Sequence, residues 1–147
     1  MDTTRASTTA ARSEAPDGHQ LIAAGLEGHG ITHVRAIGGT PIHETLAACL
    51  RHGIRVVGVH NQQAAAMMAA SYNYMTGRLS AAVILSAGPA IANSVTGLLV
   101  AHDNDWPLLV IGGCRPIDMR GRGAFQDLDA VPIVGSITRF AARLDRP

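Results

Sequence analysis

Short apolar runs rich in β-branched residues alternate along this chain with segments of helical composition, and this alternation restricts the possible fold most. Four such runs read as buried strands, at residues 31–37, 54–59, 79–85 and 108–111. Continuous apolar strands separated by helices of about 10 to 15 residues favour a mainly parallel sheet with helices on both faces. The sequence therefore predicts an α/β fold.

Helical segments fill the stretches between these strands. The first follows Asp17, a residue type suited to capping a helix, and stops near Gly28 and Gly30. Three further helices are predicted, at residues 42–50, 62–75 and 90–101. Met67, Met68 and Met75 recur at helical spacing, so they are expected to fill the core rather than to contact a cofactor.

The C-terminal part of the chain has a weaker pattern. Residues 114–129, rich in Arg, Gly and Asp, read as an irregular loop. A short helix over 131–139 and a terminal strand over 140–144 are expected after it. At the other end, residues 1–16 read as a disordered leader with no apolar region of a secretory signal, so the predicted domain covers 17–147.

Composition restricts the function classes. A chain of 147 residues with 47% hydrophobic and 16% charged side chains fits one globular domain. Its formal net charge is +1, its basic residues are scattered and only 3% of its residues are aromatic, which argues against a nucleic-acid partner. Cys49 and Cys114 read as reduced thiols of a cytoplasmic protein, and polar residues interrupt the apolar stretch 81–101, so no membrane segment is expected.

Ligands of parallel α/β sheets collect beyond the carboxyl ends of the strands. Here those ends lead into four loops, at residues 38–41, 60–63, 86–90 and 112–126. The loop 38–41, Gly-Gly-Thr-Pro, suits either an anion at a helix N-terminus or a plain turn with Pro41 at the first helical position. The cluster 60–63, His-Asn-Gln-Gln, offers polar groups for chemistry, or simply a helix cap at Asn61.

Two other kinds of site are not supported by the sequence. The seven histidines show no spacing typical of a metal site. Gly121-Arg122-Gly123 lacks the third glycine of a dinucleotide-binding motif and does not directly follow a strand.

Three stretches in order carry a resemblance to a known family. They read GVHNQQAA at 58–65, AGPAIAN at 87–93, and WPLLVIGG at 106–113 followed by GAFQ at 123–126. Together they resemble the N-terminal pyrimidine-binding domain of thiamine-diphosphate enzymes, above all the branch of 2-hydroxyacyl-CoA lyase, oxalyl-CoA decarboxylase and acetolactate synthase. The likeness runs from residue 17 to about residue 143.

The resemblance implies roles for particular residues. Gln62 stands where the family has a glutamate that bonds the pyrimidine ring, and it is a catalytic candidate together with Gln126, His43 and His60. Phe125 and Gln126 would face the substrate. The residues implied to bind the cofactor are Gly39, Thr40, Pro41, Gln62, Gly88, Pro89 and Asn93.

The chain departs from the family at two of these motifs and in length. An amide at Gln62 can hydrogen-bond a ring nitrogen but cannot exchange a proton with it, as a carboxylic acid can. Ala90 replaces a glycine that usually ends the SGPG-like turn. The diphosphate-binding domain of the family, with its Mg²⁺ motif, is absent from the sequence.

Two functions are therefore compatible with the resemblance. In the first, the chain is the pyrimidine-domain subunit of a two-chain lyase, decarboxylase or carboligase that depends on thiamine diphosphate and Mg²⁺. A partner chain would hold the metal and the diphosphate, and the substrate would be a 2-keto acid, an acyloin or a 2-hydroxyacyl-CoA. In the second, it is a non-catalytic module that binds or regulates a full-length enzyme of the family. An exposed apolar face is expected in either case, and with it association into an oligomer.

Overall fold

A four-stranded parallel sheet forms the centre of the molecule, in a computed structural model that describes residues 17–145. Its strands lie in the order β2-β1-β3-β4 and are β1 (His33–Ala36), β2 (Arg55–Gly58), β3 (Ala81–Leu85) and β4 (Leu109–Gly112). Every pairing is parallel. The predicted α/β class is thereby confirmed, whereas the predicted leader 1–16 lies outside the described residues.

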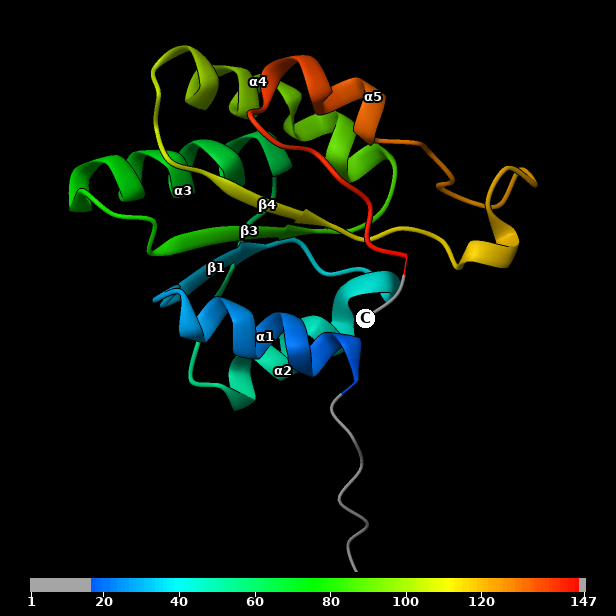
Figure 1. Cartoon of the computed structure of the whole chain (residues 1–147), viewed down its shortest axis with the longest axis horizontal. Coiled ribbons are helices and arrows are strands. Elements are labelled where there is room, and N and C mark those ends of the chain that lie inside the picture. Colours follow the sequence, from blue (N-terminus) through cyan, green and yellow to red (C-terminus); the bar gives the residue numbers. More distant parts are fainter. Residues whose placement is uncertain (1–16, 146–147) are drawn as a thin grey trace, which may run out of the picture.

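Helices cover both faces of this sheet (Figure 1). On one face lie α1 (Gly18–Gly28) and α2 (His43–Arg51), and on the other lie α3 (Gln62–Thr76) and α4 (Pro89–Asp103). The short α5 (Val131–Val134) lies beside α4. The four long helices begin and end within two residues of the predicted bounds.

Local chemistry explains where the helices begin and end. The Asp17 side chain accepts a 2.8 Å hydrogen bond from the backbone nitrogen of Gln20 and caps α1. Asn61 caps α3 in the same way, accepting from the nitrogen of Ala64 at 3.0 Å. The helix ends at Gly77, whose φ of +65° is a backbone conformation that glycine adopts without steric cost.

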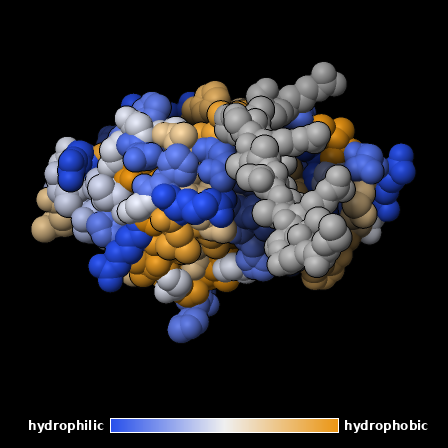
Figure 2. Space-filling view, turned by 90° about the horizontal axis from the view of Figure 1, so that it is seen from below, coloured by the Kyte–Doolittle hydropathy of each residue, from blue (hydrophilic) through white to orange (hydrophobic). Residues whose placement is uncertain are grey.

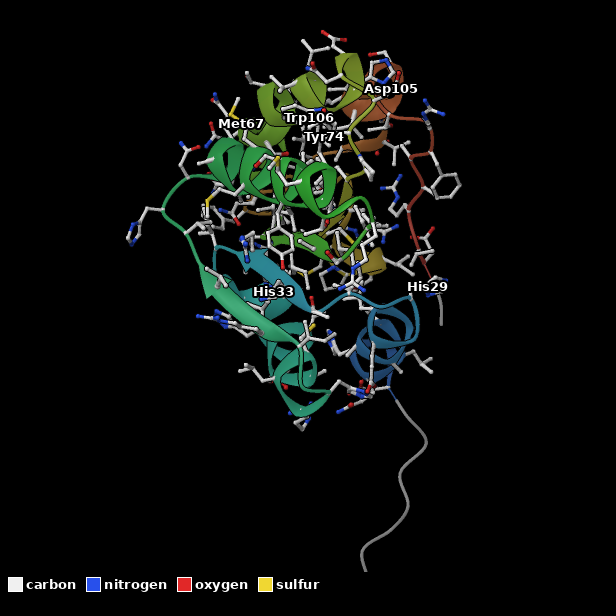
Figure 3. The ribbon with its side chains drawn as sticks, turned by 90° about the vertical axis from the view of Figure 1, so that its left-hand side faces the viewer. His29, His33, Met67, Tyr74, Asp105 and Trp106 are labelled. Carbon is white, nitrogen blue, oxygen red and sulfur yellow. The ribbon has the colours of Figure 1, made fainter. Side chains whose placement is uncertain are left out.

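Small residues let the layers pack closely. All of β3 is buried, with Val83 in contact with one core and Ile84 with the other. Between α3 and α4 the contact is tighter still, because a Cβ added at Gly97 would lie 2.6 Å from Cβ of Ala66. Tyr74 of α3 stacks on Trp106 just before β4, with ring centroids 5.2 Å apart (Figure 3).

Two predictions for the core and the sheet are wrong. Met68 and Met75 are not core residues, since 42% and 80% of their surfaces are exposed. Four alanines of α3, Ala65, Ala66, Ala69 and Ala70, occupy the buried side of the helix instead. The segment 140–144 forms no strand, and the outer side of β4, the edge of the sheet, stays unpaired within the described residues.

The end of the chain also differs in its helix. Where one helix was expected over 131–139, α5 is followed by a 3₁₀ turn (Gly135–Ile137), and the backbone is then irregular. The first three predicted strands are longer than the observed ones by two or three residues in total, because the apolar runs continue into turns, and the fourth is shifted by one residue from β4.

The outer surface mixes apolar and polar side chains. Figure 2, a view of the face formed by α1 and α2, shows hydrophobic residues gathered between hydrophilic ones. Leu21 of α1 and Leu50 of α2 are 45% and 61% exposed. Among residues 17–145, no helix is both long and apolar enough to cross a membrane.

Candidate functional site

A cavity of about 700 Å³ opens at the carboxyl ends of the strands. It receives residues from all four loops that the sequence indicated, because parallel strands deliver these loops to one edge of the sheet. Its lining consists of Ile37, Gly38, Gly39, Thr40, Pro41, Gln62, Ser86, Pro89, Ala90, Asn93, Arg115, Phe125 and Gln126. The cavity thus joins three separated sequence motifs into one site.

Gln62 and Asn93 meet across the first turns of α3 and α4. The Nδ2 atom of Asn93 donates a 2.6 Å hydrogen bond to Oε1 of Gln62. Within residues 17–145, Nε2 of Gln62 has no hydrogen-bond partner, so its two hydrogens remain available to a ligand. The pair therefore presents a donor, and no acid, at this point of the cavity wall.

The loop after β1 approaches the loop after β3 closely. A Cβ added at Gly39 would lie 2.3 Å from Oγ of Ser86, so a side chain at this position would force the two loops apart. Thr40–Ile42 form a 3₁₀ turn with Pro41 in its first positions, which leads directly into α2. Pro41 thus lies at the start of a helical segment, as both interpretations of this loop require.

The start of α4 is covered by the loop after β4. Gly88 precedes α4 with a φ of +52°, and a Cβ there would lie 2.5 Å from the carbonyl oxygen of Gln126. Gln126 itself has a φ of +61°. A left-handed backbone is uncommon for a residue other than glycine and concentrates at functional sites. Gly88 is therefore not part of the cavity lining, but it allows the backbone of Gln126 to approach the start of α4 closely.

Arg115 is a cavity residue that the sequence reasoning missed. Its Nε donates a 2.6 Å hydrogen bond to the carbonyl oxygen of Phe125, and its guanidinium carbon lies 5.8 Å from the centre of the Phe125 ring. It is the one charged side chain among the lining residues. The sequence indicated this residue only through its position in the loop 112–126. That loop was predicted to contribute to a site, but Arg115 was not named as one of its residues.

Two of the predicted catalytic residues lie outside the cavity. His60 and His43 are both exposed, and neither belongs to the lining. His43 lies beneath the loop instead, with Nε2 3.5 Å from the position of a Cβ on Gly38. The remaining predicted residues, Gln62, Gln126 and Phe125 with Gly39, Thr40, Pro41, Pro89 and Asn93, do line the cavity together.

The donor set determines what this cavity can hold. The amides of Gln62 and Asn93 and the hydroxyls of Thr40 and Ser86 can hydrogen-bond the edge of a nitrogen heterocycle, and prolines and Phe125 can contact its faces. The lining contains no carboxylate, so it supplies no proton-exchanging acid. Within residues 17–145, no three His, Cys, Asp or Glu side chains gather as metal ligands.

Comparison with known proteins agrees with the motifs. Residues 16–133 match the family described as thiamine pyrophosphate enzyme, N-terminal TPP binding domain. The chain is 34% identical to 2-hydroxyacyl-CoA lyase of Arabidopsis thaliana over 128 residues, which is 86% of this chain and 22% of the lyase. It is 35% identical to human 2-hydroxyacyl-CoA lyase 1 over 138 residues, 93% of this chain and 24% of that protein.

An acetolactate synthase also matches. The large subunit IlvG of Mycobacterium tuberculosis is 34% identical over 136 residues, 92% of this chain and 25% of the synthase. The chain thus spans about a quarter of the length of these relatives or slightly less. Two of the three enzyme types named by the sequence resemblance recur among them.

Proposed function

Because the chain belongs to the thiamine pyrophosphate enzymes, as an N-terminal TPP-binding domain, we propose that it supplies the pyrimidine-binding half of a lyase, decarboxylase or carboligase site. A second polypeptide, holding the diphosphate and Mg²⁺, would complete the site. The substrate would be a 2-keto acid, an acyloin or a 2-hydroxyacyl-CoA. Thiamine diphosphate, when bound, supplies the electron sink that lets a carbon–carbon bond next to a carbonyl break or form.

The hydrogen-bonded pair of Gln62 and Asn93 in the cavity wall is the observation that carries this proposal. Asn93 occupies Oε1 of Gln62 at 2.6 Å and so fixes which end of the amide is free. The free Nε2 can donate to an unprotonated ring nitrogen and hold the pyrimidine in position. The residues present therefore fit binding of the cofactor's pyrimidine ring.

They do not fit proton exchange with that ring. An amide has no proton to give up at neutral pH, whereas a carboxylic acid in this place would act as a general acid and base, worth about 10² to 10⁴ in rate. Arg115, the one charged lining residue, carries a guanidinium, which offers hydrogen-bond donors and no acceptor. Gln62 thus positions the ring, and proton transfer would depend on water or on the second polypeptide.

The cavity supplies only part of the site that the proposal requires. The relatives that the chain matches are about four times longer than the matched part. The described residues supply no cluster of acidic side chains for Mg²⁺, and the one charged group of the lining is a cation. A metal prefers oxygen ligands with negative charge, so it would be held elsewhere.

Calorimetry tests the proposal directly. Thiamine diphosphate with Mg²⁺ is titrated into this chain alone, into a candidate diphosphate-domain chain alone, and into their co-purified complex. Saturable binding in the complex only, together with cofactor-dependent cleavage or formation of a carbon–carbon bond, is the expected result. A stable complex that neither binds the cofactor nor catalyses this chemistry would refute it.

Gln62 also supports a second candidate function. A domain that keeps the fold and the cavity but carries an amide in the place of the family's glutamate could act as a non-catalytic module that binds a full-length enzyme of the family. In that case the chain forms a stable complex with such an enzyme, and replacing Gln62 by Glu does not raise the activity of the complex. The calorimetric titration separates the two candidates, because only the first requires this chain and a diphosphate-domain chain to bind the cofactor together.

A further inference from the structure

The cavity carries a single charge, and it is positive. Arg115 lies in the lining with no acidic side chain among the other lining residues, and no ion pair is formed by Arg115 within residues 17–145. The loop 114–129 that carries it does hold carboxylates, but within residues 17–145 Asp118 is exposed and forms no ion pair, Asp127 accepts from the backbone nitrogen of Gly121, and Asp129 pairs with Arg143. The guanidinium is thus left without a counter-charge beside the reaction space.

The same guanidinium is held in a defined orientation. Its Nε donates at 2.6 Å to the carbonyl oxygen of Phe125, and the ring of Phe125 packs near it, with 5.8 Å between the guanidinium carbon and the ring centre. These contacts use one donor and leave the two terminal nitrogens, which together bind a planar carboxylate through two parallel hydrogen bonds. A guanidinium with a fixed orientation and two free terminal nitrogens can bind an anion in addition to stabilising the loop.

From this geometry we infer that the site takes a carbonyl substrate bearing a carboxylate that is retained through the reaction, and that Arg115 binds it. This inference rests on the proposed function and narrows its substrate class. A carboxylate that leaves as carbon dioxide must lose its negative charge in the transition state. A cation bound to that group would stabilise the ground state more and slow the step. The group held by Arg115 is therefore one that stays in the product, such as the carboxylate of an acceptor 2-keto acid or the second carboxylate of a dicarboxylic substrate.

The position of Phe125 and Gln126 supports this assignment. Both residues line the cavity. Arg115 donates a hydrogen bond to the carbonyl oxygen of Phe125, and the next residue, Gln126, has a left-handed backbone with φ +61°. Arg115 therefore stabilises the loop at Phe125 and Gln126, where it faces the cavity. Uncharged acyloins would leave the guanidinium unpaired and are expected to be poor substrates.

A titration of the full chain without cofactor or second polypeptide tests the inference. The ¹⁵N–¹H spectrum is followed at constant ionic strength while oxamate, which is a carboxylate, or oxamide, its neutral isostere, is added. We expect oxamate to shift the Phe125 and Gln126 amide resonances saturably and oxamide not to do so. Arg115→Gln keeps a donor for the Phe125 carbonyl but removes the charge, and it should weaken oxamate binding about tenfold, as expected for loss of a charge-assisted bond.

Three further arms make the result decisive. Arg122→Gln, at an exposed arginine of the same loop outside the lining, should bind oxamate like the parent chain. Arg115→Lys keeps the charge and should retain part of the affinity for oxamate. This variant serves as a second test of the charge if the Gln variant folds poorly. Equal shifts with oxamate and oxamide, or unchanged oxamate binding in Arg115→Gln, would overturn the inference, as would inorganic phosphate binding more tightly than oxamate. Because no cofactor is present, this result is independent of whether the complex binds thiamine diphosphate.

Discussion

Nδ2 of Asn93 donates a 2.6 Å hydrogen bond to Oε1 of Gln62, joining the first turn of α4 to the first turn of α3. This bond decides which end of the Gln62 amide faces a ligand, because an amide whose oxygen is occupied can offer only its nitrogen. The chemistry of the site thus depends on two residues that lie 31 positions apart in the sequence. A change at Gln62 should therefore alter proton transfer, whereas a change at Asn93 should alter cofactor binding.

Gln62→Glu should restore proton exchange in the complex with a diphosphate-domain chain. A carboxylic acid in this place can both donate to the ring nitrogen and take the proton back, so the cofactor-dependent rate should rise by about 10²- to 10⁴-fold, the usual range for a general acid and base. Asn93 can still donate to the new carboxylate. The steady-state rate and hydrogen–deuterium exchange at the reactive carbon of the cofactor both measure the change.

Gln63→Glu is the matched control for that variant. Gln63 is the next residue of the same helical turn and is absent from the cavity lining, so the same change of charge there should leave the rate unaltered. An equal gain from both variants would show that charge at the start of α3, and not proton exchange, is responsible. No gain from Gln62→Glu in a complex that binds the cofactor would favour the non-catalytic module.

Asn93→Asp should reverse the Gln62 amide. The new carboxylate accepts hydrogen bonds only, so Gln62 must turn its Nε2 toward it and its oxygen toward the ligand. The cavity then offers an acceptor where the ring nitrogen needs a donor, and the affinity of the complex for thiamine diphosphate should fall about tenfold. Calorimetry measures this loss. Because Asn93 is exposed, the thermal stability of the chain should change little, and a large fall in melting temperature would contradict this explanation.

Sequence reasoning located the site but could not supply its full contents. The four loops at the strand ends met in one cavity because parallel strands place all such loops at one edge. Arg115 and the left-handed Gln126 lie in a stretch without periodicity, where only the three-dimensional path of the loop determines which side chain enters the cavity. His43 and His60 are close to the cavity in sequence but outside its lining for the same reason.

The methionines illustrate a second limit. Helical spacing shows that Met68 and Met75 share one side of α3, but it does not say which side is buried. The side that packs on the sheet and on α4 carries alanine, because the close approach at Gly97 leaves no room for a larger side chain. In the same way, the apolar residues of 140–144 suggest a strand, although no unpaired edge receives them.

Asn73→Ala should lower the free energy of unfolding substantially. Asn73 is fully buried, and its Nδ2 donates to the carbonyl oxygens of Ala81 and Pro107, both at 2.9 Å. Its Oδ1 accepts from the backbone nitrogens of Ser80 and Ala81 at 3.0 and 2.7 Å. Truncation leaves these buried backbone groups unpaired, at a cost of about 2–4 kcal/mol.

Chemical denaturation of the two variants Asn73→Ala and Asn104→Ala measures this effect. Asn104 is exposed and makes one side-chain hydrogen bond, to Val100 at 2.8 Å, so its loss should cost well under half as much. Similar losses in the two variants would contradict the role given to the buried network.

Gly97→Ala should destabilise the chain through the contact between α3 and α4. The added methyl group would lie 2.6 Å from Cβ of Ala66 and 2.7 Å from the carbonyl oxygen of Gln63, so the helices must separate, at a cost of about 1–3 kcal/mol. Gly25→Ala in α1 meets nothing within 4 Å and should instead stabilise by about 0.5–1 kcal/mol. Thermal unfolding measures both. Two shifts of the same sign would contradict the proposed packing.

Arg35→Met should stabilise the chain and reduce its sensitivity to acid. Among the described residues 17–145, Nε and Nη1 of Arg35 are buried without a hydrogen-bond partner, and the guanidinium lies 5.6 Å from the Tyr72 ring centre. An apolar side chain of similar length avoids that desolvation and should add about 1–3 kcal/mol to the free energy of unfolding. Arg55→Met, at an exposed position on the neighbouring strand, should add little.

Arg35 also affects how the free energy of unfolding depends on pH, through the pKa of His33. Burial first, and then the charges of Arg35 and Arg55, hold the pKa of His33 below its usual value, and its ring lies 5.4 Å from that of Tyr72. As the pH falls through about 6.5, the unfolded chain takes up this proton before the folded chain does, so the free energy of unfolding decreases until the pH is below the folded pKa. Arg35→Met should raise the pKa of His33 and shrink this decrease. Histidine NMR titration and denaturation at either side of that window measure the two effects, and an unchanged His33 pKa in the variant would show that the charge of Arg35 does not contribute to it.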